Sequence, residues 1–366
     1  MAPNAFLGVL LHAIGGFAAG SFYIPFKKVT GWAWETYWLT GGLFIWVFCP
    51  ILAAVLTIPE LTQVYREAPP AVLVTTFLGG VGWGIGHLTF GLSLRYLGMS
   101  LGMGLALGFC TFFGALVPPL FKGTFLELFR ETSGRFSLGG LGVCLGGVFF
   151  CSWAGMSKER ELSNEAKQET IAEFNFSKGV WVAFFAGVMS ACFAFGIELG
   201  DPLQRLAAEH GAQDINANNA PLLLILMGGG IANIIGCVWL NVHNKTSYDY
   251  IDRTTPLLTN YVFCAIAGIV AYAEFIFFGM GETQMGKFSV FASWPIHMAF
   301  IILFSNMWGI IFHEWKGTSP RTRVLLTIGL VALVVSTMIS SYGSYLKEHE
   351  TSTPSIAIGA TDDPGP

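Results

Sequence analysis

Six ionisable side chains stand inside long apolar runs of this chain, where water cannot easily solvate a charge. They are His12, Glu35, His87, Glu198, Glu274 and His297. Ionisable groups at membrane depth are costly, and they usually mark proton or substrate pathways. Their presence points to proton-transfer chemistry inside a lipid-embedded protein.

Glu274 has the most apolar surroundings of the six, because its neighbours from Ala271 to Phe278 are nearly all apolar. Such surroundings favour the protonated carboxyl group, so Glu274 could take up and release a proton. The alternative is a permanently protonated Glu274 that makes one structural hydrogen bond.

The histidines give a second set of proton-coupling candidates. His12, His87 and His297 carry imidazole groups, which titrate near physiological pH and can relay protons. Each could equally be a neutral side chain that hydrogen-bonds two helices. Glu35 is a weaker candidate because it lies at the start of its apolar run, near the membrane interface.

Aromatic and amide side chains in the same runs suggest the kind of ligand. Sugars pack their C–H faces on aromatic rings, and their hydroxyl groups need a few placed polar partners. The substrate-binding candidates are Trp83, Tyr272, Trp294, Asn233, Gln284, Trp38 and Tyr23. This composition fits a sugar, but it leaves an amino acid, a nucleoside or a drug open. The tryptophans around Trp38 could instead form an interfacial belt.

Other chemistries have no support in the sequence. All seven cysteines fall in apolar runs and none forms C-x-x-C, so we read them as small apolar side chains and expect neither a disulfide nor a metal. No phosphate-binding loop or dinucleotide motif is present. We therefore expect no enzyme, no cofactor, no ATP-driven motor and no nucleic-acid partner, while the oligomeric state stays open.

Ten apolar runs must position these groups. Charged residues make up 11% of the chain, against roughly 25% in soluble domains. About 20 apolar residues cross a bilayer as a helix, which satisfies its own backbone hydrogen bonds. We predict an all-α integral membrane protein with ten transmembrane helices, at 5–26, 35–58, 71–92, 97–121, 137–156, 179–200, 219–241, 258–281, 290–312 and 322–345.

The ten predicted spans divide into two halves of five. Phe90-Gly91 and Gly98 recur at the same spacing as Phe278-Gly279 and Gly286, which suggests an internal repeat. Five spans per half invert the second half, so we predict inverted repeats with a site near the bilayer midplane. The predicted parts are a first repeat at 1–156, a charged central loop at 157–178, a second repeat at 179–346 and a disordered tail at 347–366.

Smaller features add three expectations. Glycines four apart allow membrane helices to approach closely, as in Gly98 with Gly102, Gly104 with Gly108, and Gly142 with Gly146. Asp201-Pro202 suits the start of a short interfacial helix, although an ordinary loop is an even alternative. Lys and Arg number twelve on the side of Lys27 and seven on the side of the N-terminus, so we expect the side of Lys27 to be cytoplasmic.

Several segments resemble the L-rhamnose–proton symporter family, a member of the drug/metabolite transporter superfamily. In the first half they are Phe22 to Val29 (FYIPFKKV), Trp32 to Thr36 (WAWET), Trp83 to Gly86 (WGIG) and Arg95 to Ser100 (RYLGMS). In the second half they are Met227 to Gly230 (MGGG), Ser293-Trp294, His297-Met298 and Glu314-Trp315. The resemblance spans nearly the whole chain apart from the central loop and the tail.

The resemblance implies a carrier that takes up L-rhamnose or a related 6-deoxy sugar with protons across the inner (cytoplasmic) membrane. His12, Glu35 and His297 match the family pattern, whereas Glu274 and His87 stand where the family often carries a neutral amide. A drug or metabolite exporter of the same superfamily, and a membrane sugar sensor that transports nothing, are the alternative functions.

Overall fold

The computed structural model describes all residues except 1–3, 98, 162–174, 286–288, 314 and 353–366. The described residues form helices and connecting turns, without a strand. Ten helical stretches among them are long and apolar enough to cross a membrane, which confirms the prediction of ten spans. They are Ala5–Phe26, Trp34–Thr57, Pro70–Ser93, Gly102–Lys122, Thr132–Lys158, Ser177–Glu209, Asp214–Asn244, Leu257–Glu282, Phe291–Ile311 and Pro320–Leu346.

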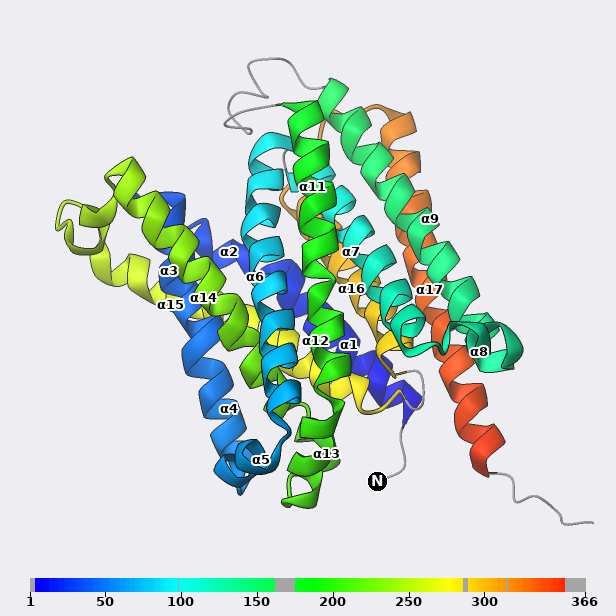
Figure 1. Ribbon diagram of the computed structural model, residues 1–366. Coiled ribbons are helices and arrows are strands. Elements are labelled where there is room, and N and C mark those ends of the chain that lie inside the picture. Colours follow the sequence, from blue (N-terminus) through cyan, green and yellow to red (C-terminus); the bar gives the residue numbers. More distant parts are fainter. Residues whose placement is uncertain (1–3, 98, 162–174, 286–288, 314, 353–366) are drawn as a thin grey trace, which may run out of the picture.

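Several spans are built from more than one helix (Figure 1). In chain order the helices are α1 (Ala5–Ser21), α2 (Tyr23–Phe26), α3 (Trp34–Leu43), the π-helix η1 (Phe44–Phe48), α4 (Cys49–Thr57), α5 (Leu61–Glu67), α6 (Pro70–Leu97), α7 (Met99–Lys122), α8 (Phe125–Arg130), α9 (Thr132–Glu161), α11 (Phe176–Ser190), α12 (Cys192–Leu199), α13 (Asp201–Glu209), the 3-10 helix η2 (Asp214–Asn216), α14 (Asn219–Asn244), the 3-10 helix η3 (Ser247–Ile251), α15 (Leu257–Glu282), α16 (Ser289–Ile311) and α17 (Pro320–Ser352).

Two of the interruptions follow from proline. Pro25 has no N–H to give to the carbonyl group of Ser21, and α1 ends at Ser21. Pro50 likewise cannot donate to the carbonyl group of Trp46, and the chain there widens into the π-helix η1. The sixth span breaks at Ala191, between α11 and α12, without a proline.

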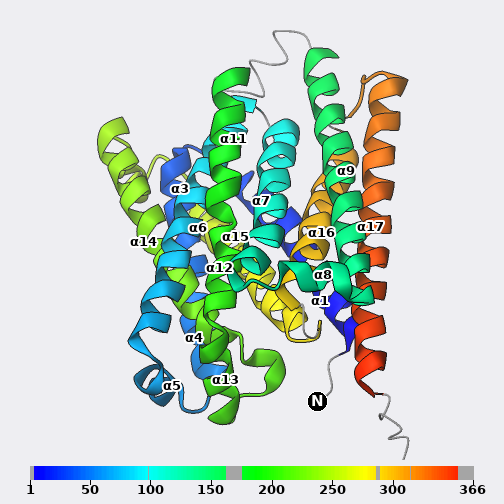
Figure 2. The same cartoon turned by 45° about the vertical axis from the view of Figure 1, so that its right-hand side comes forward.

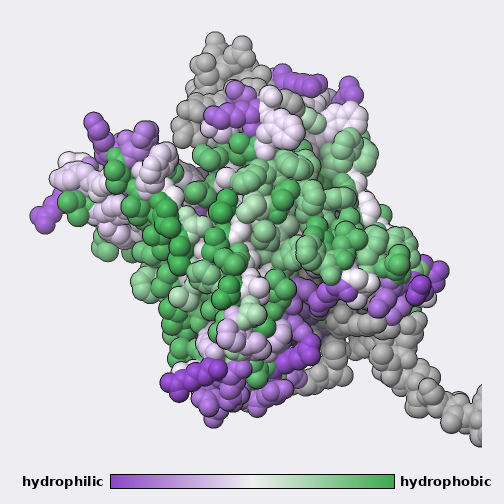
Figure 3. Space-filling model, in the orientation of Figure 1, coloured by the Kyte–Doolittle hydropathy of each residue, from purple (hydrophilic) through white to green (hydrophobic). Residues whose placement is uncertain are grey.

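The bundle has two polar ends and an apolar belt. The start of α1, the helices α5 and α13, and the end of α17 lie at one end, which we call the N face (Figures 1 and 2). The start of α3 and the end of α9 lie at the other end, which we call the loop face. Hydrophilic residues gather at both ends in Figure 3, with a hydrophobic band between them. This distribution is the one that a bilayer requires of a membrane-spanning bundle.

Helices from the two halves of the chain are interleaved. Helix α1 packs against α15 and α16, and α11 packs against α6 and α7. Helix α6 also crosses α14, and α9 runs beside α17. The central part of the bundle is therefore made by α1, α6, α7, α11, α14, α15 and α16, which surround the site described below.

Glycine allows some of these crossings. A Cβ atom on Gly80 of α6 would lie 2.7 Å from the carbonyl carbon of Ile225 of α14, so only glycine fits there. Gly104 and Gly108 meet α9 in the same way, as expected from their spacing. The expectation for Gly142 and Gly146 is wrong, since a Cβ atom on either would meet nothing within 4 Å. Gly98, which also belongs to the repeat motif, lies outside the described residues, as does Gly286.

The polar segments differ partly from the expected boundaries. The interfacial helix forms as α13, with Gly200 rather than Asp201 at its N-cap. Helix α9 continues to Glu161 and α11 begins at Phe176, so the described ends of the central loop are helical. Residues 162–174 of that loop and 353–366 of the tail lie outside the described residues, while α17 extends to Ser352.

Candidate functional site

A cavity of about 530 Å³ enters the bundle from the loop face. Its mouth lies between the ends of α2, α3, α14 and α16, where Lys27, Glu35, Asn244 and Phe312 line it. A pocket of this size falls in the range that holds small-molecule ligands. Tyr23 and Trp38 also line this outer chamber, so the structure brings three of the candidate residues together there.

A smaller inner chamber of about 90 Å³ continues the cavity toward the middle of the bundle. The two chambers share the lining residues Ala19, Phe22, Phe90, Met103 and Leu107. The inner chamber is lined mainly by rings, together with one carboxylate. Its ring and acidic residues are Phe22, Trp83, His87, Phe90, Phe193, Phe275, Phe278, Trp294, His297 and Glu274.

Glu274 and His297 face each other at this inner chamber. The distance from His297 Nε2 to Glu274 Oε1 is 3.8 Å, which is longer than a hydrogen bond. The side chain of His297 is 2% exposed and that of Glu274 is 18% exposed, so Glu274 retains contact with the cavity. The pair can share a proton or a net charge after a small shift of either side chain.

His12 lies behind this pair, away from the cavity lining. Its ring lies edge-on to that of His297, with 5.6 Å between the centroids. His12 is completely buried, and neither ring nitrogen has a hydrogen-bond partner among the described residues. The sequence thus supplies three titratable groups from three helices, α1, α15 and α16, in one buried cluster.

Local sequence explains how these helices come so close. A Cβ atom on Gly15 of α1 would lie 2.9 Å from Cε1 of His297, so the glycine leaves room for that ring. Trp294 precedes His297 by one helical turn on α16, which places both rings on the same side of the helix. The indole N–H of Trp294 donates to the backbone oxygen of Cys110 in α7 at 3.0 Å, which fixes the ring at the chamber wall.

A second aromatic cluster surrounds His87, which also lines the inner chamber. Its ring stacks on Trp83 at 5.1 Å and lies 4.8 Å from Trp38. His87 Nδ1 lies 3.4 Å from Oδ1 of Asn233, the same oxygen that accepts a hydrogen bond from Trp38 Nε1. The Asn233 amide nitrogen is used for the backbone oxygens of Gly84 and Gly229. Asn233 therefore positions the two rings rather than lining either chamber.

Comparison with known proteins decides the family. Residues 1–345 match the model of the L-rhamnose-proton symport protein family. L-rhamnose-proton symporters of Yersinia pestis and Cronobacter sakazakii are 34% and 35% identical to this chain, over 92% of its length and 97% of theirs. The chain belongs to the L-rhamnose-proton symport protein family. With ten helices among its described residues that are long and apolar enough to cross a membrane, this family member is a multi-pass membrane transporter, not an enzyme.

In this member of the symport family, the other candidate residues lie apart from the inner chamber. Glu35 accepts hydrogen bonds from Asn244 Nδ2 and Thr246 Oγ1 at the loop face. Tyr272 is 7% exposed within the main apolar core, and it lines neither chamber. Gln284 lies near the N face, where its amide donates to Thr283.

Several site residues of this symport-family member were not expected from the sequence. Phe193 and Phe278 line the inner chamber and pack against Trp294 at 5.9 and 5.6 Å. Nothing in an apolar run distinguishes such phenylalanines from core residues, so no sequence signal could have found them. Among the described residues, no group of His, Cys, Asp and Glu is arranged to hold a metal ion.

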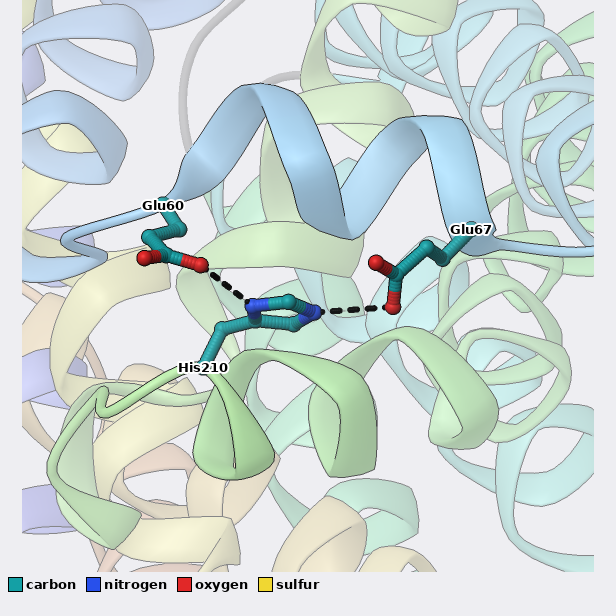
Figure 4. Close-up of polar contacts among 3 residues, drawn as sticks. All are labelled: Glu60, Glu67 and His210. Atoms are coloured by element: carbon teal, nitrogen blue, oxygen red, sulfur yellow. Dashed lines mark hydrogen bonds and ion pairs between the residues drawn. The ribbon is translucent and has the colours of Figure 1, made fainter.

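The N face of this symport-family member is tied together by side chains from both halves. His210, after α13, lies between two glutamates of the α5 segment (Figure 4). Its Nδ1 is 2.7 Å from Glu60 Oε2 and its Nε2 is 2.9 Å from Glu67 Oε2. Tyr65 Oη donates to the backbone oxygen of Ala220 in the same region. These contacts join α5 to α13 and α14 on the side away from the cavity mouth.

The His210 contact predicts a pH-dependent stability of this face. Hydrogen bonds to Glu67 and then Glu60 raise the pKa of His210 above its ordinary value near 6.5. A raised histidine pKa contributes stability that is complete below pH 6.5 and is lost as pH rises through the raised pKa. We expect wild type to melt at a higher temperature than His210→Gln at pH 6, with the difference vanishing at alkaline pH. A difference in melting temperature that is constant with pH would contradict this account.

Proposed function

We propose that this chain is a secondary active transporter that takes up L-rhamnose or a related 6-deoxy sugar with protons across the inner (cytoplasmic) membrane. The sugar and the proton come from its relatives, which are L-rhamnose-proton symporters. The observation that carries the proposal is the pair of Glu274 and His297 beside an aromatic chamber at membrane depth. Proton acceptor and ligand site are then neighbours, as coupled transport requires.

We also propose two five-helix inverted repeats, at 1–156 and 179–346, of the kind found in the drug/metabolite transporter superfamily. Pairs of helix contacts support this arrangement. Helix α1 contacts α15 and α16, while its counterpart α11 contacts α6 and α7, the counterparts of those two helices. The first span of each half is also interrupted, after Ser21 and after Ser190. Interrupted helices at a repeat interface are typical of transporter sites.

The excess of Lys and Arg at the loop face favours a cytoplasmic position for that face. The cavity then opens to the cytoplasm, and the His210 contacts close the outer face. Such a conformation is the one that releases sugar and protons after uptake. The reverse conformation would open between α5 and α13 on the N face.

The charge at the inner chamber explains how proton binding could be coupled to sugar transport. An ionised Glu274 beside a neutral His297 leaves one negative charge at the inner chamber, and closing the chamber over it would remove its water. Burying an uncompensated charge costs on the order of 5 kcal/mol. Protonation of Glu274, or of the His297 and His12 pair, removes that cost. The carrier would therefore rearrange readily only when the proton is bound.

The sugar would lie in the inner chamber and the adjoining part of the outer one. Trp83 and Trp294 offer ring faces for its C–H groups, while Glu274 and His297 can bond its hydroxyl groups. In this proposal Asn233, Tyr272 and Gln284 do not touch the sugar, and Trp38 and Tyr23 meet it on its way to the loop face.

Uptake into proteoliposomes tests the function. The purified chain should accumulate labelled L-rhamnose when the outside is made acidic, and an uncoupler should abolish the accumulation. Rhamnose that enters only down its own gradient would exclude proton coupling. Binding without entry would indicate a sensor, and proton-driven movement in the opposite direction would indicate an exporter.

A further inference from the structure

A buried carboxylate lies beyond the site, near the N face. Glu282 ends α15, eight residues after Glu274, and two turns of helix separate them by about 12 Å. Glu282 is only 4% exposed. Its Oε2 accepts a hydrogen bond from Asn218 Nδ2 at 2.5 Å, and the same amide nitrogen donates to the backbone oxygen of Gly279 at 3.0 Å. The amide of Asn218 thus holds the carboxylate at the inner edge of the closed face.

His12 packs against the last turn of α15, next to the residue that carries this carboxylate. A Cβ atom on Gly281, the residue before Glu282, would lie 2.8 Å from Cε1 and 3.0 Å from Nδ1 of His12. The glycine therefore lets the His12 ring reach the last turn of α15. On its other side the ring faces His297, which lies 3.8 Å from Glu274. The His12 ring thus adjoins the end of α15 that carries Glu282 on one side, and the His297 and Glu274 pair on the other.

We propose that Glu282 and His12 form the proton path from the N face to the Glu274 and His297 pair. This inference rests on the proposed proton-coupled uptake and adds to it a route and a residue, Glu282. Along the path, the O–H bond of Glu282 breaks as an N–H bond forms on His12. The other nitrogen of His12 then gives a proton to His297, which passes one to Glu274. An imidazole ring serves this relay because one nitrogen accepts while the other donates.

The path is interrupted in the present conformation, as coupling demands. Both ring nitrogens of His12 lack hydrogen-bond partners among the described residues, and the gap from His297 to Glu274 exceeds hydrogen-bond length. Glu274 faces a cavity that is open to the loop face. A continuous path to the N face in this state would let protons cross without sugar. The relay connects when the cavity closes and the rings shift together.

The experiment compares two transport modes of the full-length chain in proteoliposomes. Exchange of labelled for unlabelled L-rhamnose at equal pH needs no net proton entry, whereas accumulation under an acid-outside gradient does. We expect Glu282→Gln to lower the initial rate of proton-driven accumulation by at least about tenfold and to leave exchange within about twofold of wild type. The matched control is Glu198→Gln, since Glu198 also lies near the N face but pairs with Lys122 of α7.

A second variant separates proton transfer from a structural role of the same carboxylate. Asn218→Leu removes the hydrogen bond to Glu282 but keeps the carboxyl group. A relay predicts that this variant retains most accumulation, whereas a purely structural contact predicts a loss equal to that of Glu282→Gln. Three results would overturn the relay. Asn218→Leu could lose as much accumulation as Glu282→Gln. Glu282→Gln could accumulate rhamnose like wild type, or lose exchange and accumulation to the same extent. Wild type that exchanges rhamnose but never accumulates it would instead refute the proposed function, and with it the relay.

Discussion

Glu274→Gln is expected to stop proton-driven uptake while sugar exchange continues. Glutamine has nearly the shape of a protonated glutamate, so the variant resembles a carrier whose proton is always bound. It can rearrange with sugar, but it cannot release a proton after each cycle. We expect the initial rate of proton-driven L-rhamnose accumulation to fall by about a hundredfold, with exchange at equal pH within about twofold of wild type.

The measurement is labelled-sugar flux in proteoliposomes, combined with a pH-sensitive dye inside them. Glu274→Asp is the matched variant, because it keeps an ionisable group in the same place and should retain coupled uptake. Glu274→Gln with an unchanged rate would assign the proton to His297 and His12. In that case the part of Glu274 in the proposed function would be limited to bonding the hydroxyl groups of the sugar.

The span pattern was predictable because lipid imposes it. A helix that crosses hydrocarbon must be apolar over about 20 residues, and every predicted span overlaps an observed one. Two breaks in these helices also follow from the sequence, since Pro25 and Pro50 remove backbone donors. The rotation of each helix about its axis could not be predicted in this way, because it depends on packing against neighbouring helices. Gly142 and Gly146 have suitable spacing, yet a Cβ atom on either would meet no described atom within 4 Å.

The candidate site was predictable in composition but not in geometry. Glu274 and His297 were recognisable because ionisable groups are costly inside a membrane and usually have a function. Trp294 was recognisable as an aromatic ring deep in its predicted span. Their proximity to His12 depends on Gly15 and Gly281, and no pattern in one helix tells which partner its glycines face. The Asn233 amide could bind a sugar hydroxyl group. However, where α6 crosses α14, this amide donates to the backbone oxygens of Gly84 and Gly229 instead. Glu282 escaped notice because it ends its span, where exposure to water would be ordinary.

Trp294→Ala is expected to weaken sugar binding more than any other wall substitution. The indole ring packs against Phe193 and Phe278, whose own rings are 5.8 Å apart, and it donates a hydrogen bond to the backbone oxygen of Cys110. Removing it takes away a flat surface for the sugar and lets the two phenylalanines move into the space. Loss of one aromatic contact is worth about 1.5 kcal/mol, which corresponds to about a tenfold higher half-saturating concentration of L-rhamnose.

Trp294→Phe distinguishes the ring face from the indole hydrogen bond. Phenylalanine keeps a flat surface beside Phe193 and Phe278 but cannot donate to the oxygen of Cys110. If stacking on the sugar is the role of Trp294, the half-saturating concentration should rise less than about threefold in this variant, and far more in Trp294→Ala. Equal increases would mean that the hydrogen bond to α7 shapes the chamber and that the ring itself does not touch sugar. A normally folded Trp294→Ala protein with an unchanged half-saturating concentration would move the sugar site toward Trp83 and Trp38, the rings beside His87.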